Sequence, residues 1–259
     1  AASCIRQPSD GMKVFTNDER SEKSRKMVME LLVTDQPKKE ISHDPDSHFW
    51  KMADEVDIKK SRFDKRDPEI IPESDNSHVA MSVNLDACIN CNLCVRACRE
   101  VQVNDVIGMG NRGHTSKVIF DFNDPMGDST CVSCGECVQA CPTGALMESN
   151  LLDQKGKKVI KPDRKVDSLC PYCGVGCQLT YNIKDEKIVS VDGRDGPANN
   201  NRLCVKGRFG FDYIHNPERI TKPLIRRKDA PKNPKEKLDS LNPLTHFREV
   251  SWEEALDFA

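Results

Sequence analysis

Cysteine is the residue type in this chain whose spacing could do chemistry. Twelve of its 13 cysteines fall into three groups of four. Two of these groups, beginning at Cys88 and at Cys131, share the spacing CxxCxxCxxxC. Three thiolates at three-residue steps can hold one iron–sulfur cube, while the fourth, carried away at the start of a helix, points in another direction. The two runs therefore predict two clusters that each need a ligand from elsewhere.

The expected ligand sets follow the two-cluster ferredoxin pattern, in which the last cysteine of each run serves the cluster of the other run. The first [4Fe–4S] cluster would be held by Cys88, Cys91, Cys94 and Cys141, and the second by Cys131, Cys134, Cys137 and Cys98. Structural zinc prefers two separated CxxC pairs, so a third cysteine at the same step would be surplus to a tetrahedral site. Disulfides need an oxidising compartment and would not need this repeated spacing. Because the spacing occurs twice, iron–sulfur clusters are the favoured interpretation.

The two runs depart from the simple ferredoxin pattern in one respect. Proline follows Cys141, but Arg99 follows Cys98, and residues 99–130 separate the runs. This insertion contains Lys117–Phe122, whose β-branched and aromatic residues predict a strand. We therefore expect a ferredoxin fold that has been extended without losing its ligands.

The third cysteine group has a different spacing and predicts a cluster domain of its own. Cys170, Cys173 and Cys177 lie close together, and Cys204 follows after 26 residues. The intervening segments Leu179–Ile183 and Lys187–Val191 alternate at period two and predict a β-hairpin. Glycines at positions 174, 176 and 207 favour a bulky cluster that needs room and backbone N–H donors. Zinc is an alternative here, because two close pairs could form.

The remaining elements must position these cysteines. A helix is predicted from Asp18 to about Thr34, which Pro37 ends. Its apolar positions on one face are Met27, Val28, Leu31 and Leu32. Residues 36–77 are rich in Pro, Asp, Lys and Ser and are expected to form an irregular connector on a neighbouring surface. Ser251–Glu254 has the form of a capping box that opens a helix. Helices and strands in separate segments predict an α+β fold.

The composition limits the possible partners. Only 37% of the residues are hydrophobic and 31% are charged, so apolar burial alone is expected to be insufficient for stability. The formal net charge of −2 argues against nucleic acid as a partner. No apolar run reaches the length of a membrane span, and no signal peptide is visible. The chain lacks an initial Met and closes within a predicted helix, so we expect a fragment of a longer protein.

Two stretches carry a family resemblance. Residues 170–177, CPYCGVGC, and residues 202–210, RLCVKGRFG, resemble the N-terminal [4Fe–4S] domain of molybdenum or tungsten enzymes that use bis-molybdopterin guanine dinucleotide. The continuation from Phe211 through Arg227 is similar to the formate dehydrogenase branch. With the preceding two-cluster domain, nearly the whole chain resembles the alpha subunit of NAD-dependent formate dehydrogenases.

The resemblance implies a function and further site residues. The ligands of the cluster nearest the pterin would be Cys170, Cys173, Cys177 and Cys204, and Lys206 would lie between that cluster and the pterin. The full-length protein would carry three [4Fe–4S] clusters, a [2Fe–2S] cluster and molybdenum or tungsten bound to bis-molybdopterin guanine dinucleotide. Formate would be the substrate, and flavin/NAD-binding and small iron–sulfur subunits would be the partners in the cytoplasm. The catalytic metal ligands of the family lie after residue 259, so no catalytic residue is expected here.

The resemblance also implies segment boundaries. Residues 1–17 would be the tail of a truncated [2Fe–2S] domain, 18–78 a helix and irregular connector, and 79–150 the two-cluster ferredoxin domain. Residues 163–221 would form the [4Fe–4S] domain, and 222–259 a basic linker and the start of a molybdopterin-binding domain. Cys4 would be a [2Fe–2S] ligand, with an incidental thiol an equal alternative. His43 and His48 are expected at the surface, because residues 41–48 lack the cysteines of the corresponding complex I cluster.

Three alternative functions are open from the residues. Another bis-molybdopterin enzyme, such as an assimilatory nitrate reductase, shares the third cysteine group, although the doubled ferredoxin run favours formate. An electron-transfer subunit of the complex I or hydrogenase type would carry no pterin. A zinc-stapled scaffold would contain no sulfide, and metal analysis distinguishes it from the other functions.

Overall fold

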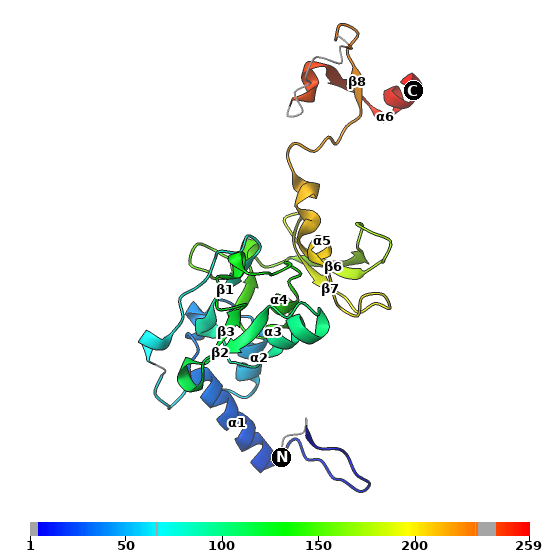
Figure 1. The fold of residues 1–259 in the computed structure, drawn as a ribbon. Helices are drawn as coiled ribbons and strands as arrows, with labels where there is room; N and C mark the ends of the chain where they lie inside the picture. Colours follow the sequence, from blue (N-terminus) through cyan, green and yellow to red (C-terminus); the bar gives the residue numbers. More distant parts are fainter. Residues whose placement is uncertain (1–4, 66, 231, 233–241) are drawn as a thin grey trace. The chain divides into compact units, whose positions relative to one another are not determined.

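The computed structural model describes residues 5–65, 67–230, 232 and 242–259. Contacts divide the chain into two compact units, Ala1–Phe209 and Gly210–Ala259, and each is described by itself (Figure 1). Both units mix helices with short antiparallel strands, in agreement with the predicted α+β class. No helix among the described residues has the length and apolar character needed to cross a membrane.

A strand–loop–helix–strand unit occurs twice in residues 81–148 and carries the two CxxCxxCxxxC runs. Strands β1 and β4 pair antiparallel with Met81 opposite Glu148, and β2 and β3 pair antiparallel with Ile107 opposite Phe120. The predicted strand at Lys117 is thereby confirmed. The elements of the first copy are β1 (Met81–Val83), α3 (Leu93–Arg96), the π-helix η5 (Ala97–Val101) and β2 (Ile107–Gly110), and those of the second are β3 (Lys117–Phe120), α4 (Glu136–Ala140) and β4 (Leu146–Glu148).

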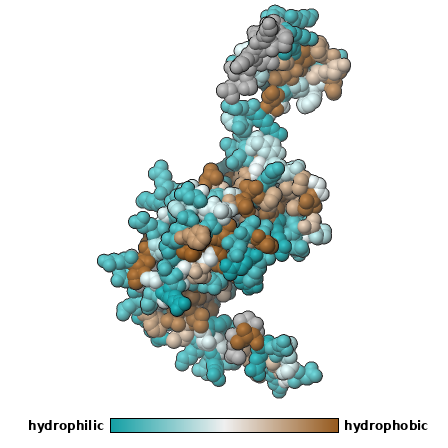
Figure 2. Space-filling view, in the orientation of Figure 1, coloured by the Kyte–Doolittle hydropathy of each residue, from teal (hydrophilic) through white to brown (hydrophobic). Residues whose placement is uncertain are grey.

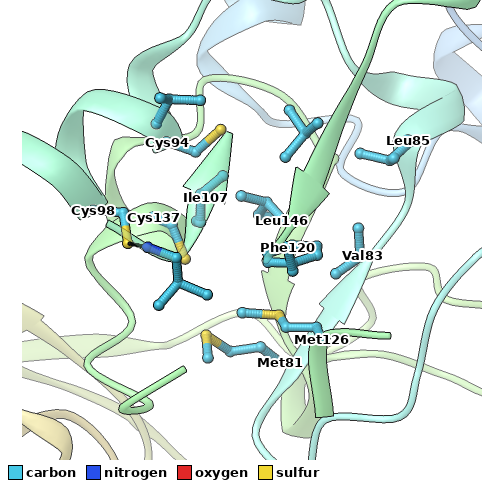
Figure 3. Packing of buried hydrophobic residues seen from close by; sticks show 13 residues of the cluster. Met81, Val83, Leu85, Cys94, Cys98, Ile107, Phe120, Met126, Cys137 and Leu146 are labelled. Carbon is cyan, nitrogen blue, oxygen red and sulfur yellow. Dashed lines mark hydrogen bonds between the residues drawn. The ribbon is translucent and has the colours of Figure 1, made fainter. Parts of the chain in front are cut away.

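The main hydrophobic core lies between these strands and the cysteine-bearing helices (Figure 3). Met81 and Met126 are almost completely buried, at 0% and 1% exposure. Cys94, Cys98 and Cys137 belong to the same buried cluster as the strand residues. Sulfur atoms thus occupy part of the volume that aliphatic side chains fill in an ordinary domain, which is consistent with the low hydrophobic content of the sequence.

A second, smaller core joins the N-terminal helices α1 (Glu19–Thr34) and α2 (His48–Glu55). The predicted helix is confirmed as α1, and Asp18 caps it, because its carboxylate accepts hydrogen bonds from the N–H groups of the first turn. The predicted apolar face is only partly correct, since Val28 and Leu31 remain about half exposed. The buried stripe instead consists of Met29 and Val33, four residues apart, which pack with α2.

Helix α2 replaces part of the irregular connector that the sequence predicted. Ser47 caps its N-terminus by accepting a hydrogen bond from the Trp50 N–H at 3.4 Å. Phe49, Trp50 and Ala53 are buried, and the two aromatic rings pack edge to face at 5.2 Å. The Phe49 N–H also donates to the Pro142 carbonyl at 2.9 Å. The connector therefore folds against the second cysteine run, and its composition did not reveal this because few residues make the contact.

The third cysteine group lies at one end of a three-stranded antiparallel sheet of order β5–β6–β7. Its strands are β5 (Arg164–Leu169), β6 (Gln178–Lys184) and β7 (Lys187–Gly193). The predicted hairpin is confirmed as β6 and β7, whereas β5 was not predicted. Leu169 pairs with Gln178, so the loop carrying Cys170 to Cys177 closes directly on the sheet. Helix α5 (Val205–Phe209) follows Cys204.

The second unit contains the strands β8 (Leu224–Arg226) and β9 (Phe247–Glu249), which pair antiparallel, and the helix α6 (Trp252–Phe258). The predicted helix start is confirmed, because Ser251 Oγ accepts a hydrogen bond from the Glu254 N–H at 3.1 Å. Strand β8 lies within the segment from residue 222 onward that was predicted as a basic linker. Residues 231 and 233–241 of that basic segment lie outside the described residues.

Short helical turns complete the fold. The 3₁₀ turns are η2 (Lys39–Ile41), η3 (Pro68–Ile70), η4 (Leu85–Ala87), η6 (Gly113–Thr115), η7 (Met126–Asp128), η8 (Ser149–Leu151), η9 (Gly210–His215) and η10 (Pro243–Thr245). On the face shown in Figure 2, hydrophilic residues cover most of the surface and apolar residues gather in separate patches.

Candidate metal centres

The two ferredoxin-type cysteine runs share an unusual backbone conformation at matching positions. Asn90 and Asn92 in the first run have φ angles of 53° and 61°, and Ser133 and Gly135 in the second have 56° and 71°. Asparagine and glycine tolerate this left-handed region better than other residues, and its use by serine is less common. The repeat in the sequence is therefore also a repeat in backbone geometry, with two left-handed residues folding each loop around its cysteines.

This geometry directs backbone N–H groups toward sulfur. Asn90 donates to Cys88 Sγ at 3.4 Å, Ser133 donates to Cys131 Sγ at 3.4 Å, and Val106 donates to Cys98 Sγ at 3.3 Å. Hydrogen bonds of this kind stabilise thiolate and sulfide charge and help to set the potential of a cluster. The equivalent bonds in the two runs have the same length, as expected for two copies of one binding loop.

The first cysteine group gathers around Cys94. Burial, followed by the nearby charges of Cys141, Cys88 and Cys91, raises the pKa of the Cys94 thiol to about 12. Cys141 comes first among these neighbours although it belongs to the other run. The charges of three further cysteines, from two segments of the chain, therefore act on Cys94.

The second group gathers around the buried Cys137. Burial raises the pKa of this thiol well above its ordinary value, followed by the charges of Cys134, Cys131, Cys94 and Cys98. Burial also raises the pKa of Cys131, and Cys134 and Cys98 add to that effect. Cys98 thus lies with the second run rather than with its own. Cys94 and Cys137 also belong to the same buried cluster, so the first and second groups are adjacent.

The third group is held between the sheet and α5. Burial raises the pKa of Cys177, and Cys170, Cys173 and Cys204 raise it further, so the distant Cys204 joins the three close cysteines. The Cys170 N–H donates to the Cys177 carbonyl at 2.8 Å and closes the loop. A Cβ added at Gly207 would lie 3.7 Å from Cys170 Sγ. The glycine therefore leaves free the space beside this sulfur, which a side chain would fill in van der Waals contact.

The donor chemistry of all three groups fits an iron–sulfur cluster. Each group offers four sulfur atoms, the complete protein ligand set of a [4Fe–4S] cluster. Thiols whose pKa is raised by burial stay protonated until a bound cation compensates the thiolate charge, and cluster iron supplies that charge. In the part of the chain that the structure describes, no three His, Cys, Asp or Glu side chains form a chelating group for a single metal ion.

The groups differ in their access to solvent. Among the predicted ligands, Cys94, Cys98 and Cys137 are buried, whereas Cys91, Cys173 and Cys204 are exposed. The second group has no exposed cysteine, and the first and third groups each have at least one. Lys206, the predicted pterin-side residue, is exposed on α5 two positions after Cys204. It therefore lies beside the third group and is accessible from outside.

Two residues near the second group were missed from the sequence. His78 is buried, and its Nδ1 accepts a hydrogen bond from the Ala80 N–H at 3.1 Å, which leaves Nε2 to donate to Ser133 Oγ at 2.9 Å. Burial lowers the pKa of His78, partly opposed by Asp75, so the neutral ring is favoured. Arg208 is 1% exposed and donates to the Cys134 carbonyl at 2.8 Å. For Arg208, the available sequence signal was its position four residues after Cys204, in a segment with Lys206 and Gly207.

His43 differs from its prediction as a surface residue. Its Nδ1 lies 2.8 Å from the Gly156 carbonyl, and its Nε2 lies 2.9 Å from Asp86 Oδ1. Burial would lower its pKa, but the hydrogen bonds to Asp86 and Gly156 outweigh burial and raise it. His43 thus ties the connector to the start of the first cysteine run. His48 is exposed as expected, and Cys4 lies outside the described residues.

Both cysteine-rich segments match known domain families. Residues 87–145 match the family described as "4Fe-4S dicluster domain", and residues 163–216 match "Molybdopterin oxidoreductase Fe4S4 domain". The chain therefore carries a ferredoxin-like two-cluster domain followed by an Fe4S4 domain of the molybdopterin oxidoreductase type. Together they define an iron–sulfur electron-transfer module of that class.

Curated relatives match this chain over a part of their own length. "Probable oxidoreductase YjgC" of Bacillus subtilis (strain 168) is 33% identical over 70% of this chain and 20% of its own length. "Putative formate dehydrogenase SH0748" of Staphylococcus haemolyticus (strain JCSC1435) is 34% identical over 66% of this chain and 20% of its length. An NADH-quinone oxidoreductase subunit of Rhizobium meliloti (strain 1021) is 32% identical over 99% of this chain and 28% of its length. The chain thus spans less than a third of each.

A solved structure shares the fold. A chain in the crystal structure of an NAD+-reducing [NiFe]-hydrogenase in the H2-reduced state has a TM-score of 0.53 and 24% sequence identity. The match covers 57% of this chain and 64% of the hydrogenase chain. The similarity concerns the arrangement of the elements.

Proposed function

We propose that this chain binds three [4Fe–4S] clusters and conducts single electrons along them. Cys88, Cys91, Cys94 and Cys141 would hold the first, Cys131, Cys134, Cys137 and Cys98 the second, and Cys170, Cys173, Cys177 and Cys204 the third. The main observation in support is that each group includes one cysteine that is remote in sequence. The charge of this cysteine raises the pKa of another thiol of the same group. Four sulfurs with N–H donors around them are the environment that such a cluster requires.

The proposed order of transfer is third cluster, second cluster, first cluster. The neighbouring charges of Cys94 and Cys137 support adjacency of the first and second clusters. Arg208 supports adjacency of the second and third, because it follows Cys204 on α5 and contacts the Cys134 carbonyl. The exposed cysteines lie in the first and third groups, so electrons would enter and leave through the first and third clusters.

The finer proposal is that the module belongs to the alpha subunit of an NAD-dependent formate dehydrogenase. A molybdenum or tungsten bis-molybdopterin centre in the full-length protein would supply the two-electron oxidation of formate to carbon dioxide. Lys206, exposed beside the third group, would lie between that centre and the cluster. An upstream [2Fe–2S] cluster, with Cys4 as a ligand, would pass electrons to flavin/NAD-binding and small iron–sulfur subunits. The formate dehydrogenase names among the relatives support this assignment.

A second candidate is an electron-transfer subunit of the complex I or hydrogenase type. One observation favours it: the NADH-quinone oxidoreductase subunit of Rhizobium meliloti matches 99% of this chain, against 66% for the putative formate dehydrogenase SH0748. Metal and pterin analysis of the full-length protein distinguishes the two functions. Molybdenum or tungsten with pterin, together with formate-dependent reduction of the clusters, supports formate dehydrogenase, and the absence of both supports the alternative.

The electron-transfer function itself is tested by metal and sulfide analysis after anaerobic purification and reconstitution. Three cubes correspond to about twelve iron and about twelve acid-labile sulfide per chain, with paramagnetic resonance signals after reduction. A Cys94→Ala variant should lose about a third of the iron, because one ligand of one cube is gone. Zinc without sulfide, or reconstituted protein with no paramagnetic signal, would contradict the proposal.

A further inference from the structure

Arg208 occupies an unusual place between two of the cysteine groups. It lies on α5, and its backbone N–H donates to the Cys204 carbonyl at 3.1 Å, one helical turn earlier. Its side chain is only 1% exposed, although arginine is rarely buried to this extent unless its charge is paired or its donors are satisfied. A buried guanidinium thus connects to a predicted ligand of the third cluster through the helix that carries both residues.

The guanidinium group reaches across to the second cysteine run. Its Nε donates to the Cys134 carbonyl at 2.8 Å, and its Nη1 donates to the Val191 carbonyl on β7 at 3.2 Å. Its Nη2 donates to Gln139 Oε1 at 2.9 Å and to Glu136 Oε2 at 3.2 Å. The acceptors come from the second run, from α4 and from the sheet of the third domain. Arginine suits this role because its planar fork offers five fixed donors.

The second run has a matching space for this side chain. Gly135 has a φ of 71°, and a Cβ added there would lie 2.1 Å from Arg208 Cδ and 3.0 Å from Phe209 Cζ. The equivalent position of the first run is Asn92, which has nearly the same φ of 61° but is exposed. The two copies of the binding loop therefore differ where the third domain docks on one of them. The first run serves as an internal reference.

The positive end of a buried ion pair faces the second cluster site, because Arg208 Nε donates to the Cys134 carbonyl while its Nη2 holds the Glu136 carboxylate. Glu136 is its one acidic hydrogen-bond partner, and the other three acceptors are neutral oxygens. Buried charges are poorly screened, so a cation hydrogen-bonded to the carbonyl of a ligand acts strongly on that site. Reduction adds one negative charge to a cluster, and a nearby fixed cation stabilises the reduced form.

We propose that Arg208 is a positioning residue for electron transfer between the third and second clusters. It holds the two binding loops in one arrangement and raises the reduction potential of the second cluster. With clusters bound, one electron would pass from the reduced third cluster to the oxidised second cluster, no bond would form or break, and Arg208 would remain protonated. The inference rests on the proposed three-cluster function and adds a residue that binds no iron.

The experiment is a redox titration of the reconstituted chain followed by paramagnetic resonance. A Cys134→Ser variant identifies the couple that belongs to the second cluster. In Arg208→Gln we expect the reduced-to-oxidised ratio of that couple to fall about tenfold at a fixed potential, which is ~59 mV for one electron. Arg208→Lys keeps the charge and should therefore retain most of the wild-type potential of the second cluster. Arg202→Gln, an exposed arginine near Cys204, is the matched control and should leave the second couple unchanged.

The possible results separate this inference from the function on which it rests. If the wild-type chain binds no clusters, the proposed function fails. If all three clusters are bound and Arg208→Gln leaves the second potential unchanged, or Arg202→Gln moves it equally, the inference is overturned. If Arg208→Gln does not fold, Arg208→Lys decides: a second-cluster potential close to that of the wild type supports the role of the charge, and a fall of ~59 mV or more in this charge-conserving variant refutes it.

Discussion

At the residue scale, Gly135 is the position where both backbone and neighbours exclude a larger side chain. Its φ is 71°, and an added Cβ would lie 2.1 Å from Arg208 Cδ. Gly113 has a similar φ of 63°, but nothing lies within 4 Å of an added Cβ. The two glycines therefore separate the cost of a left-handed backbone from the cost of displacing Arg208.

We expect Gly135→Ala to lower the free energy of unfolding by about 3 kcal/mol or more, because the left-handed conformation costs about 1–2 kcal/mol and the buried arginine must also move. Gly113→Ala should lose only the backbone part, about 1 kcal/mol. Urea unfolding of the reconstituted proteins measures both. Equal losses would mean that the contact with Arg208 contributes nothing.

Glu148 is a second residue whose behaviour follows from its surroundings. It lies on β4 at a cavity of about 270 Å³ that Lys158, Asp192 and Arg208 also line. Burial raises its pKa from 4.5 to about 7, and Arg208 and Lys158 oppose that rise while Asp192 adds to it. The ionised carboxylate is therefore disfavoured in the folded state relative to the unfolded chain.

The sign of the resulting pH dependence is determined by this raised pKa. Between pH 4.5 and about 7 the folded chain holds a proton that the unfolded chain has lost, so stability from this group falls as the pH rises through that window. Glu148→Gln should remove this part of the slope and stabilise the protein above pH 7 by on the order of 2 kcal/mol. Urea midpoints across the window measure the effect, with exposed Glu253→Gln as control. A slope that survives in Glu148→Gln would contradict the assignment.

At the scale of elements, the helices α1 and α2 form a small core that is distinct from the cluster-binding core. Trp50 is 3% exposed within it, and Ile89 of the first cysteine run packs at its edge. The N-terminal helices should therefore contribute stability to the first cysteine run without supplying a ligand to it.

We expect Trp50→Ala to lower the free energy of unfolding by about 3–5 kcal/mol, because it removes a buried aromatic side chain and leaves a cavity. The iron content per chain should stay unchanged, since no predicted ligand lies in this core. Trp252→Ala on α6 is the control, because Trp252 is 69% exposed and its loss should change stability by less than about 0.5 kcal/mol. Loss of iron in Trp50→Ala would show that the two cores are not independent.

At the scale of the whole molecule, the cysteine groups are arranged so that the middle one is shielded. The second group has no exposed cysteine, whereas Cys91 in the first group and Cys173 in the third are exposed. Electron transfer weakens steeply with distance, so exposed ligands favour exchange with partners and a buried middle group favours internal transfer. This arrangement is consistent with the proposed transfer from the third cluster through the second to the first.

The order of the clusters is tested in the full-length protein with Cys173→Ser. If the third cluster lies between the source of formate electrons and the other two, formate-dependent reduction of the ferredoxin-type clusters should be lost. Their reduction from the NADH side should survive, because that route does not pass through the third cluster. Paramagnetic resonance after each reductant measures both routes. Unchanged reduction by formate would contradict the proposed order, and an exposed Val175→Ala variant serves as control.

The local elements could be predicted where one short segment carries the signal. The helix capped by Asp18, the strand β3, the hairpin β6–β7 and the start of α6 all have their periodicity or cap within a few residues. Helix α2 and strand β5 were missed, because the first lies in a charged connector and the second is exposed along nearly its whole length. The buried face of α1 was misjudged because its partner α2 was unknown.

The amino-acid sequence by itself determined the chemistry of this protein, since cysteine identity and spacing are covalent facts that specify which sulfurs a cluster could use. Only the tertiary structure decided what surrounds those sulfurs. Arg208 meets Cys134 across 74 positions, and His43 meets Asp86 across 43. Such contacts leave no periodic pattern, because they depend on how separately folded elements pack. The environment that tunes a cluster is therefore visible only once the chain is folded.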